Sequence, residues 1–333
     1  MAHPFNIRLN RGAKILKLLA IVASLLTAAP VLSQVAFWQN EWPVTDFEKS
    51  SIDFIDVISG GPPKDGIPAL ASVAFITVDE NEIPLREPVI VLEIAGETPR
   101  AYPLRYLTWH EIANDVVGST PVAVTFCPLC NSGIVFDRRL NGEVLEFGVS
   151  GKLRFSDMIM FDRETESWWQ QFTGEAIVGV QLGNTLTKIV SWTESLEEFT
   201  QRNPEGLIMA RPTGYNRSYG QNPYDSYDSA ARPFLYSGDP PPHGIPPLSR
   251  VLRIGNKAWP LERLQNAEVL EEAGYRIVWQ AGMASALDSR NIAQGRDIGS
   301  IRVYDSNGND VEHEVVFAFA FNAFADNAEW MLE

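Results

Sequence analysis

Cysteine, histidine and basic residues are scarce in this sequence. Its 333 residues include 2 cysteines, 4 histidines and 27 Lys and Arg, against 42 Asp and Glu. Two cysteines are too few for the disulfide framework that stabilises many small secreted domains, so the pair needs another explanation. Because phosphate binding needs clustered cations, the acidic balance excludes nucleic acid as an expected partner. The identity of a protein or small-molecule partner stays open.

The amino-terminal end differs from the rest of the chain in charge. Four basic residues precede the first acidic residue, Glu41: Arg8, Arg11, Lys14 and Lys17. An apolar run over 18–29 follows, and then Pro30 and Val31-Leu32-Ser33. This order is typical of a secretory signal, so residues 1–33 are predicted to direct export and to be cleaved after Ser33. We therefore expect a periplasmic or secreted protein with a net charge of 23 − 42 = −19 after cleavage.

An uncleaved membrane anchor is the alternative interpretation of this end. Residues 15–36 are long enough to span a bilayer if the side chain of Lys17 extends to the bilayer surface. In that case the protein contacts the membrane only through this segment. The folded part is exported under both interpretations.

Frequent turn residues predict a fold of short strands with few helices. The sequence has 24 Gly and 22 Pro. Apolar runs bounded by turn residues predict strands at Val89–Ile94, Val122–Phe126, Ile134–Asp137, Val144–Val149, Met158–Asp162 and Ala176–Val180. Helical periodicity predicts helices at Leu104–Asn114 and Ser195–Arg202. We expect an α+β fold that is dominated by antiparallel strands.

Two segments without periodicity interrupt this pattern. Residues 34–65, which contain Gly60-Gly61-Pro62-Pro63, are predicted to form a low-order linker. Residues 206–247 are rich in Tyr and Pro and are predicted to form a long connecting segment over the surface.

The sequence contains an internal repeat. Residues Ala101–Leu107 match Ala258–Leu264 at an offset of 258 − 101 = 157, and each stretch follows a predicted strand. Repeats of this length predict two related lobes, 66–205 and 248–333. At matched positions Ala267 replaces His110 and Gln280 replaces Cys127. The second lobe is therefore predicted to be a degenerate copy, and any active site is expected in the first.

The two cysteines stand directly after an apolar strand, in Phe126-Cys127-Pro128-Leu129-Cys130-Asn131. A thioredoxin-like dithiol needs a helix after the first cysteine, and none is predicted here. Haem attachment needs His where this sequence has Asn131. A metal-binding Cys-Pro-Leu-Cys knuckle fits better, because the residue after its second cysteine often has positive φ, which Asn tolerates. A disulfide or redox-active dithiol remains the alternative.

A metal site needs more than two ligands. His110 is the expected third ligand, since it lies on the helix predicted to pack beside the cysteine-bearing strand. Glu111 and Asp157 are expected to support the site. Two thiolates and an imidazole suit Zn or Cu, whereas Mg or Ca would need oxygen ligands. A hydrogen-bonded structural role is the alternative for His110.

A second candidate site is the Tyr-rich stretch over 215–227. Four tyrosines lie within it: Tyr215, Tyr219, Tyr224 and Tyr227. Exposed tyrosines suit a binding surface, so a non-catalytic binding module is a further alternative function. The same hydroxyls could instead pin the connecting segment to the two lobes. Serine hydrolysis is excluded, because Gly148-Val149-Ser150-Gly151 lacks the spacing of a nucleophile elbow.

Several motifs together resemble an exported family catalogued as domain of unknown function 3179. They are Tyr102-Pro-Leu-Arg, Trp109-His110-Glu111, Phe126-Cys-Pro-Leu-Cys-Asn-Ser-Gly, Phe147-Gly-Val-Ser-Gly, Asp157, Phe161-Asp-Arg and Thr213-Gly-Tyr-Asn-Arg-Ser-Tyr-Gly-Gln-Asn-Pro-Tyr. The resemblance covers about 65–330. It implies export and a site around Trp109-His110-Glu111 and Cys127–Cys130, with Asn131 in the knuckle. It implies no reaction.

The first prediction concerns export. Protein isolated from its native host should begin near Gln34, or be full length in the membrane fraction, because the basic and apolar order at the amino end is read by the export machinery. Intact-mass measurement of each cell fraction checks this. Full-length protein that is soluble in the cytoplasm would contradict it.

Overall fold

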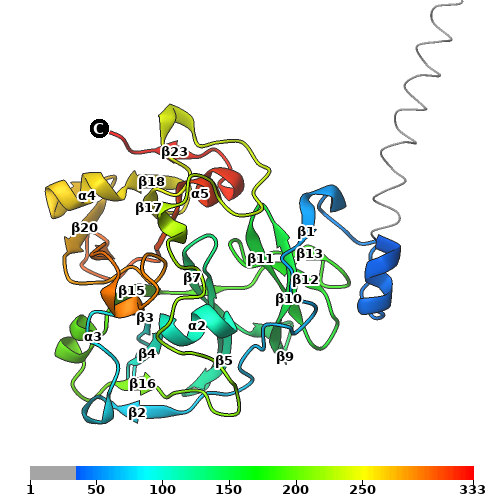
Figure 1. Cartoon of the computed structure of the whole chain (residues 1–333), viewed down its shortest axis with the longest axis horizontal. Coiled ribbons are helices and arrows are strands. Elements are labelled where there is room, and N and C mark those ends of the chain that lie inside the picture. Colours follow the sequence, from blue (N-terminus) through cyan, green and yellow to red (C-terminus); the bar gives the residue numbers. More distant parts are fainter. Residues whose placement is uncertain (1–34) are drawn as a thin grey trace, which may run out of the picture.

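The computed structural model describes residues 35–333, which form mainly antiparallel β-sheets with few, short helices (Figure 1). The predicted α+β class is therefore confirmed. The predicted signal, 1–33, lies outside the described residues. Within residues 35–333, no helix has the length and apolar character needed to cross a bilayer.

The strands form five sheets of three or more strands and one ribbon. The first sheet contains β1 (Val57–Ser59), β10 (Phe147–Arg154), β11 (Asp157–Asp162), β12 (Trp168–Gln170) and β13 (Ala176–Val178). The second contains β14 (Lys188–Ile189), β7 (Ser132–Asp137), β6 (Thr120–Cys127) and β5 (Ile112–Val117). The third contains β15 (Ser191–Ser195), β3 (Pro88–Leu92), β4 (Arg100–Pro103), β16 (Leu207–Met209) and β2 (Phe75–Thr77).

The remaining strands come mostly from the carboxyl-terminal part. The fourth sheet contains β22 (Glu314–Phe317), β17 (Arg250–Ile254), β18 (Lys257–Pro260) and β23 (Glu329–Trp330). The fifth contains β19 (Val269–Glu272), β20 (Tyr275–Gln280) and β21 (Ser300–Tyr304), and β8 (Arg139–Leu140) and β9 (Glu143–Val144) form the ribbon. The paired strands are antiparallel except β4 with β16 and β18 with β23.

The helices are short. A helical turn spans 35–41, and the others are α2 (Leu104–His110), α3 (Leu196–Arg202), α4 (Leu261–Ala267) and α5 (Ala318–Phe324). Single 3₁₀ turns are η1 (Phe54–Asp56), η2 (Val78–Glu80), η3 (Tyr227–Ser229), η4 (Pro242–Gly244) and η5 (Ile292–Gln294). The helix predicted over 104–114 ends earlier, because Glu111 has a φ of 59° and the chain then enters β5. In the capping box of α3, the Ser195 hydroxyl accepts from the Glu198 N–H.

The predicted strands are found with shifted ends, and one of them is divided. The residues predicted as Val144–Val149 fall into β9 and β10. The sequence does not predict β5 as a strand, because the helical pattern of the predicted helix over 104–114 extends into the first residues of β5. β6 then pairs with both β5 and β7, so the cysteine-bearing strand is central in its sheet.

Residues 35–65 are not a loose linker, in contrast to the prediction. Trp38, Trp42 and Phe47 are buried and pack edge-on against Trp168 of β12, at ring-centroid distances of 5.2, 5.4 and 5.3 Å. β1 extends the first sheet by pairing with β10. The aromatic residues of this segment therefore form a small apolar core together with residues of the first sheet.

Two parts of the chain have the same order of elements. β3, β4, α2, β5 and β6 in one part correspond to β17, β18, α4, β19 and β20 in the other. Both helices end at a glutamate with positive φ, 59° at Glu111 and 57° at Glu268. The carbonyl of each glutamate accepts a 2.8 Å hydrogen bond from the following strand pair, from Phe126 N–H and Trp279 N–H respectively. Glu268 thus occupies the position expected from the 157-residue offset.

These two parts are not clearly separate lobes. The sheets form a ring that resembles a five-bladed propeller (Figure 1). The main apolar core contains residues of both parts, including Val91 and Val124 from the first and Val251 and Phe317 from the second. The main core is therefore shared by the two parts, while a smaller apolar cluster lies within the second part alone.

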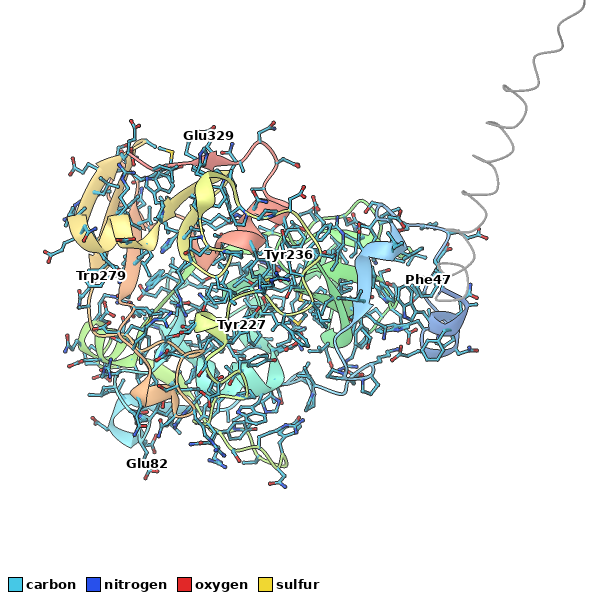
Figure 2. All side chains as sticks on the ribbon, turned by 45° about the horizontal axis from the view of Figure 1, so that its top comes forward. Phe47, Glu82, Tyr227, Tyr236, Trp279 and Glu329 are labelled. Atoms are coloured by element: carbon cyan, nitrogen blue, oxygen red, sulfur yellow. The ribbon has the colours of Figure 1, made fainter. Side chains whose placement is uncertain are left out.

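The 206–247 segment contacts both parts, through tyrosine hydroxyls on the first part and through Asp228 on the second. Tyr227 lies over the middle of the molecule in Figure 2. Three tyrosine hydroxyls of this segment bond to the first part: that of Tyr219 to His110, that of Tyr224 to Glu111 and that of Tyr227 to the carbonyl of Leu129. Buried Asp228 forms ion pairs with Arg250 at 2.9 Å and Arg296 at 3.0 Å in the second part.

Candidate functional site

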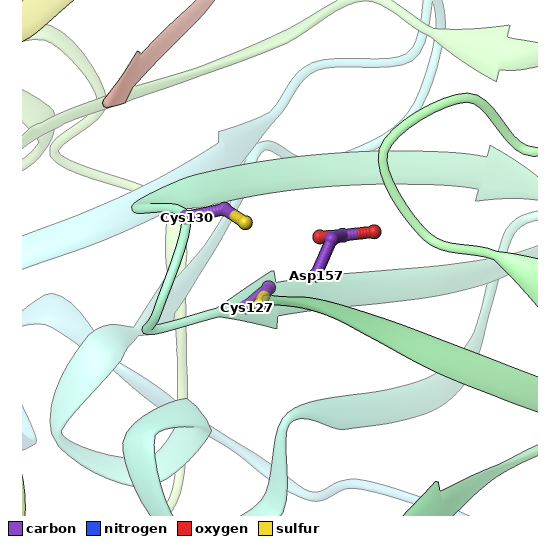
Figure 3. Close-up of side chains that lie close together, drawn as sticks. All are labelled: Cys127, Cys130 and Asp157. Atoms are coloured by element: carbon purple, nitrogen blue, oxygen red, sulfur yellow. The ribbon is translucent and has the colours of Figure 1, made fainter. Parts of the chain in front are cut away.

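Cys127 ends β6, and Cys130 lies in the tight turn that leads into β7. Hydrogen bonds from the Cys130 N–H to the Cys127 carbonyl and from the Asn131 N–H to the Pro128 carbonyl, both 3.3 Å, close this turn. Asn131 has the positive φ expected of it, 54°, and its side-chain amide donates to the Val315 carbonyl at 2.7 Å. Both thiols are free and buried. The turn presents both sulfurs to Asp157 (Figure 3).

A second turn, between β10 and β11, faces the sulfurs. Phe155 and Ser156 form it, with φ values of 50° and 65°, while Arg154 pairs with Asp157. This conformation costs about 1 kcal/mol or more for each residue that is not glycine. The Ser156 carbonyl lies 3.6 Å from the Cys130 sulfur and 3.9 Å from the Cys127 sulfur, and it accepts from both thiols.

Asp157 is the third member of the cluster. One ligand atom from each of Cys127, Cys130 and Asp157 lies within 4.8 Å of the other two. The carboxylate is oriented by Gln170, whose side-chain amide donates to Oδ2 at 2.7 Å, and by the Phe172 N–H at 3.0 Å. Oδ1 is buried and has no hydrogen-bond partner among residues 35–333. A buried acceptor that lacks a partner is costly unless a proton or cation reaches it.

Burial controls the electrostatics of this cluster. Loss of solvent raises the pKa of Asp157 to about 6, raises the pKa of the Cys127 thiol and raises that of Cys130 further. Because the three groups lie close together, a negative charge on one of them makes ionisation of the others less favourable. The two thiols therefore keep their protons near neutral pH, whereas Asp157 releases its proton above about pH 6. A metal ion that replaced the thiol protons would neutralise the same groups.

His110, the predicted third ligand, lies outside the group formed by Cys127, Cys130 and Asp157. Its Nδ1 lies 2.7 Å from the Pro68 carbonyl and its Nε2 lies 2.6 Å from the Tyr219 hydroxyl. Its ring also packs edge-on against Tyr215, with the centroids 4.7 Å apart. Both nitrogens are thus engaged by other partners, as in the structural alternative. Burial lowers the pKa of this imidazole, which favours its neutral form.

The neighbours of His110 have separate positions. The Trp109 indole N–H donates to the Gln221 carbonyl at 3.1 Å, so this residue anchors the connecting segment. Glu111, at the end of α2, is buried, and its Oε1 accepts from the Tyr224 hydroxyl at 3.3 Å. Burial, together with the charge of nearby Asp157, raises the pKa of Glu111 to about 8. Glu111 therefore lies in the electrostatic range of the cluster, whereas Trp109 supports the fold.

Sequence reasoning missed two parts of the site. The Ser156 carbonyl is a backbone group and leaves no signature in the sequence. Gln170 stands in an apolar run, Trp168-Trp169-Gln170, and nothing in that run points to Asp157. Ser156-Asp157 before an apolar strand predicts a turn, but it does not predict that this turn faces the two cysteines.

Comparison with known proteins places the chain in a family without assigning a function. The model of the family described as "Protein of unknown function (DUF3179)" matches residues 64–328. Searches of curated proteins and of solved structures each found no match. The match contains all the residues of the Cys127, Cys130 and Asp157 cluster.

The second prediction concerns Glu111 and pH. The folded chain holds this proton up to a pKa of about 8, against an ordinary value of 4.5. The unfolded chain therefore binds fewer protons in this range, and the free energy of unfolding falls as pH rises from 4.5 to about 8. Glu111→Gln should flatten this fall in metal-free protein. Urea unfolding at several pH values checks it.

The matched control is Glu97→Gln, at an exposed turn. It should leave the pH dependence of the free energy of unfolding as in the wild type. An unchanged pH dependence in Glu111→Gln would show that this carboxyl is not held protonated in the folded chain.

Proposed function

We propose that this chain, which belongs to the DUF3179 family, is an exported protein that binds one Zn or Cu ion through Cys127, Cys130 and Asp157. The observation that carries the proposal is the buried Oδ1 of Asp157, which lacks a hydrogen-bond partner beside two free thiols. Each of these groups becomes an anionic ligand when it releases its proton.

The spacing of the three groups supports a shared ion. Zn–S and Zn–O bonds of about 2.3 and 2.0 Å place tetrahedral ligand atoms roughly 3.3 to 3.8 Å apart. In the metal-free chain the three ligand atoms lie within 4.8 Å of one another. Small rotations of the side chains would therefore be enough to close a site around the ion.

The donor set favours zinc over the other candidates. Thiolates suit Zn and Cu, and a carboxylate suits harder ions, so two sulfurs and one oxygen fit a borderline cation best. Three protein ligands also leave one position of a tetrahedral site free for water or another small ligand. Copper remains the second candidate because of the two thiolates.

The thiol-disulfide alternative has less support. A dithiol that exchanges disulfides needs an exposed thiolate with a lowered pKa. Cys127 and Cys130 are buried, burial raises the pKa of both thiols, and β7 rather than a helix follows the turn. The binding-module alternative would use the tyrosines, but three of their hydroxyls already bond within the chain.

We also infer that residues 248–333 are a degenerate copy that carries no equivalent site. The matching order of elements and the positive φ at Glu111 and Glu268 support a common origin. Gln280 stands where the first copy has Cys127. The second copy would then contribute scaffold and core, while the first binds the ion.

The third prediction tests the ligand set. Wild-type protein purified without chelators should contain about one Zn or Cu ion per chain. Cys127→Ser, Cys130→Ser and Asp157→Asn should each weaken binding more than about 100-fold, beyond the usual loss from a residue that only orients a ligand. Affinity should also fall as pH falls, because protons compete for the thiolates. Elemental analysis and competition with a chelator of known affinity measure both effects.

The control is His110→Gln, which keeps hydrogen-bonding groups at a position that contacts Pro68 and Tyr219. This variant should keep the ion. Retention by Asp157→Asn together with loss by His110→Gln would restore the histidine as the ligand. Metal-free wild type with a reducible Cys127–Cys130 disulfide would favour the redox function instead.

A further inference from the structure

A pocket of about 510 Å³ lies beside the cluster of Cys127, Cys130 and Asp157. Its volume falls in the range of sites for small organic molecules. Leu129, between the two cysteines, and Met158, which follows Asp157, form part of its wall. The side chains of Cys127, Cys130 and Asp157 do not line it, so the pocket borders the cluster without including it.

Most of the pocket wall is apolar. Its large apolar side chains are Ile67, Leu129, Val149, Leu153, Met158 and Phe234. They come from four segments far apart in the sequence: the residues before β2, the β6–β7 turn, β10 with β11, and the connecting segment. An apolar cavity built this way favours the apolar body of a ligand, because binding removes that surface from water.

The charged and polar groups of the wall limit the kind of ligand. Lys152 is paired with Glu41 at 2.7 Å. The Tyr227 hydroxyl donates to the Leu129 carbonyl at 3.0 Å and accepts from the Phe234 N–H at 3.2 Å. Asp225 and Ser226 also line the pocket, but both are exposed, and the Ser226 hydroxyl donates to Asp225 Oδ1 at 3.2 Å. Away from this exposed edge, Lys152 and Tyr227 are occupied by their own partners. The wall therefore suits a neutral molecule.

Glu111 and Tyr224 form a polar pair in the less exposed part of the wall. Both line the pocket, and the 3.3 Å hydrogen bond between them is longer than the usual distance for two oxygens. A hydroxyl or carbonyl oxygen placed beside them would gain a partner from either residue. The carboxyl and hydroxyl are held in place by the end of α2 and by the connecting segment.

We propose that this pocket binds a small, neutral, largely apolar molecule that carries one hydroxyl or carbonyl group, with Glu111 and Tyr224 holding that group. This ligand site goes beyond the metal-binding function and does not depend on it. The apolar wall selects the body of the molecule, and the polar pair fixes its orientation.

The fourth prediction uses three probes of one shape: 2-naphthol, naphthalene and 2-naphthoate. The full chain should bind 2-naphthol saturably at one site. Naphthalene, which lacks the hydroxyl, and 2-naphthoate, which carries a charge, should each bind at least about tenfold more weakly, as expected for loss of one buried hydrogen bond or burial of an unpaired charge. Equilibrium dialysis with metal-free and metal-loaded protein measures all three.

Two pairs of variants locate the site. Ala230→Trp places a large ring at an exposed residue of the pocket wall and should weaken 2-naphthol binding at least about tenfold by steric exclusion. Ala231→Trp, the exposed neighbour outside this wall, should leave it unchanged. Tyr224→Phe should reduce the preference for 2-naphthol over naphthalene, and Tyr215→Phe should not.

Absence of saturable 2-naphthol binding, equal binding of naphthol and naphthalene, or full binding by Ala230→Trp would each overturn the proposal. The metal proposal is judged separately. If Asp157→Asn loses the ion but still binds 2-naphthol, both the metal proposal and the pocket proposal are supported. If the wild type holds the ion but binds none of the probes, only the pocket proposal is refuted.

Discussion

Removal of acidic groups from water is the constraint on which this site depends. Cys127, Cys130 and Asp157 are fully enclosed, and burial raises the pKa of all three. A fold tolerates such burial only when protons or a cation neutralise the groups. One Asp157 oxygen is held by Gln170 and Phe172, while the other has no hydrogen-bond partner. The cluster is therefore organised to receive positive charge at one point.

Unusual backbone conformations bring the site together. Glu111, Asn131 and Ser156 all have positive φ, at 59°, 54° and 65°. Each lies where a helix or strand ends and the chain reverses direction. The first moves the chain from α2 into β5, the second closes the cysteine turn, and the third places a carbonyl over both sulfurs. Such conformations are not confined to the site, since Glu268, in the part without the cysteines, has a φ of 57°.

The sequence predicted the local features of the site better than their spatial combination. The fold class, β6, β7, β11 and the positive φ of Asn131 follow from apolar runs and turn residues. His110 is predicted as a ligand because its helix should pack beside the cysteine-bearing strand, but in the structure its two ring nitrogens face Pro68 and Tyr219. The approach of Asp157 to the cysteines depends on how two different sheets pack, because β11 belongs to the first sheet and β6 to the second, and sequence spacing does not encode this packing. The same limit explains the shared core in place of separate lobes.

X-ray absorption at the edge of the bound metal tests the central claim most directly. If Zn binds to Cys127, Cys130 and Asp157, the spectrum should contain two sulfur neighbours at about 2.3 Å and oxygen neighbours at about 2.0 Å. It should lack the outer-shell scattering of an imidazole ring. Imidazole scattering that disappears in His110→Gln, or a first shell without sulfur, would contradict this ligand set.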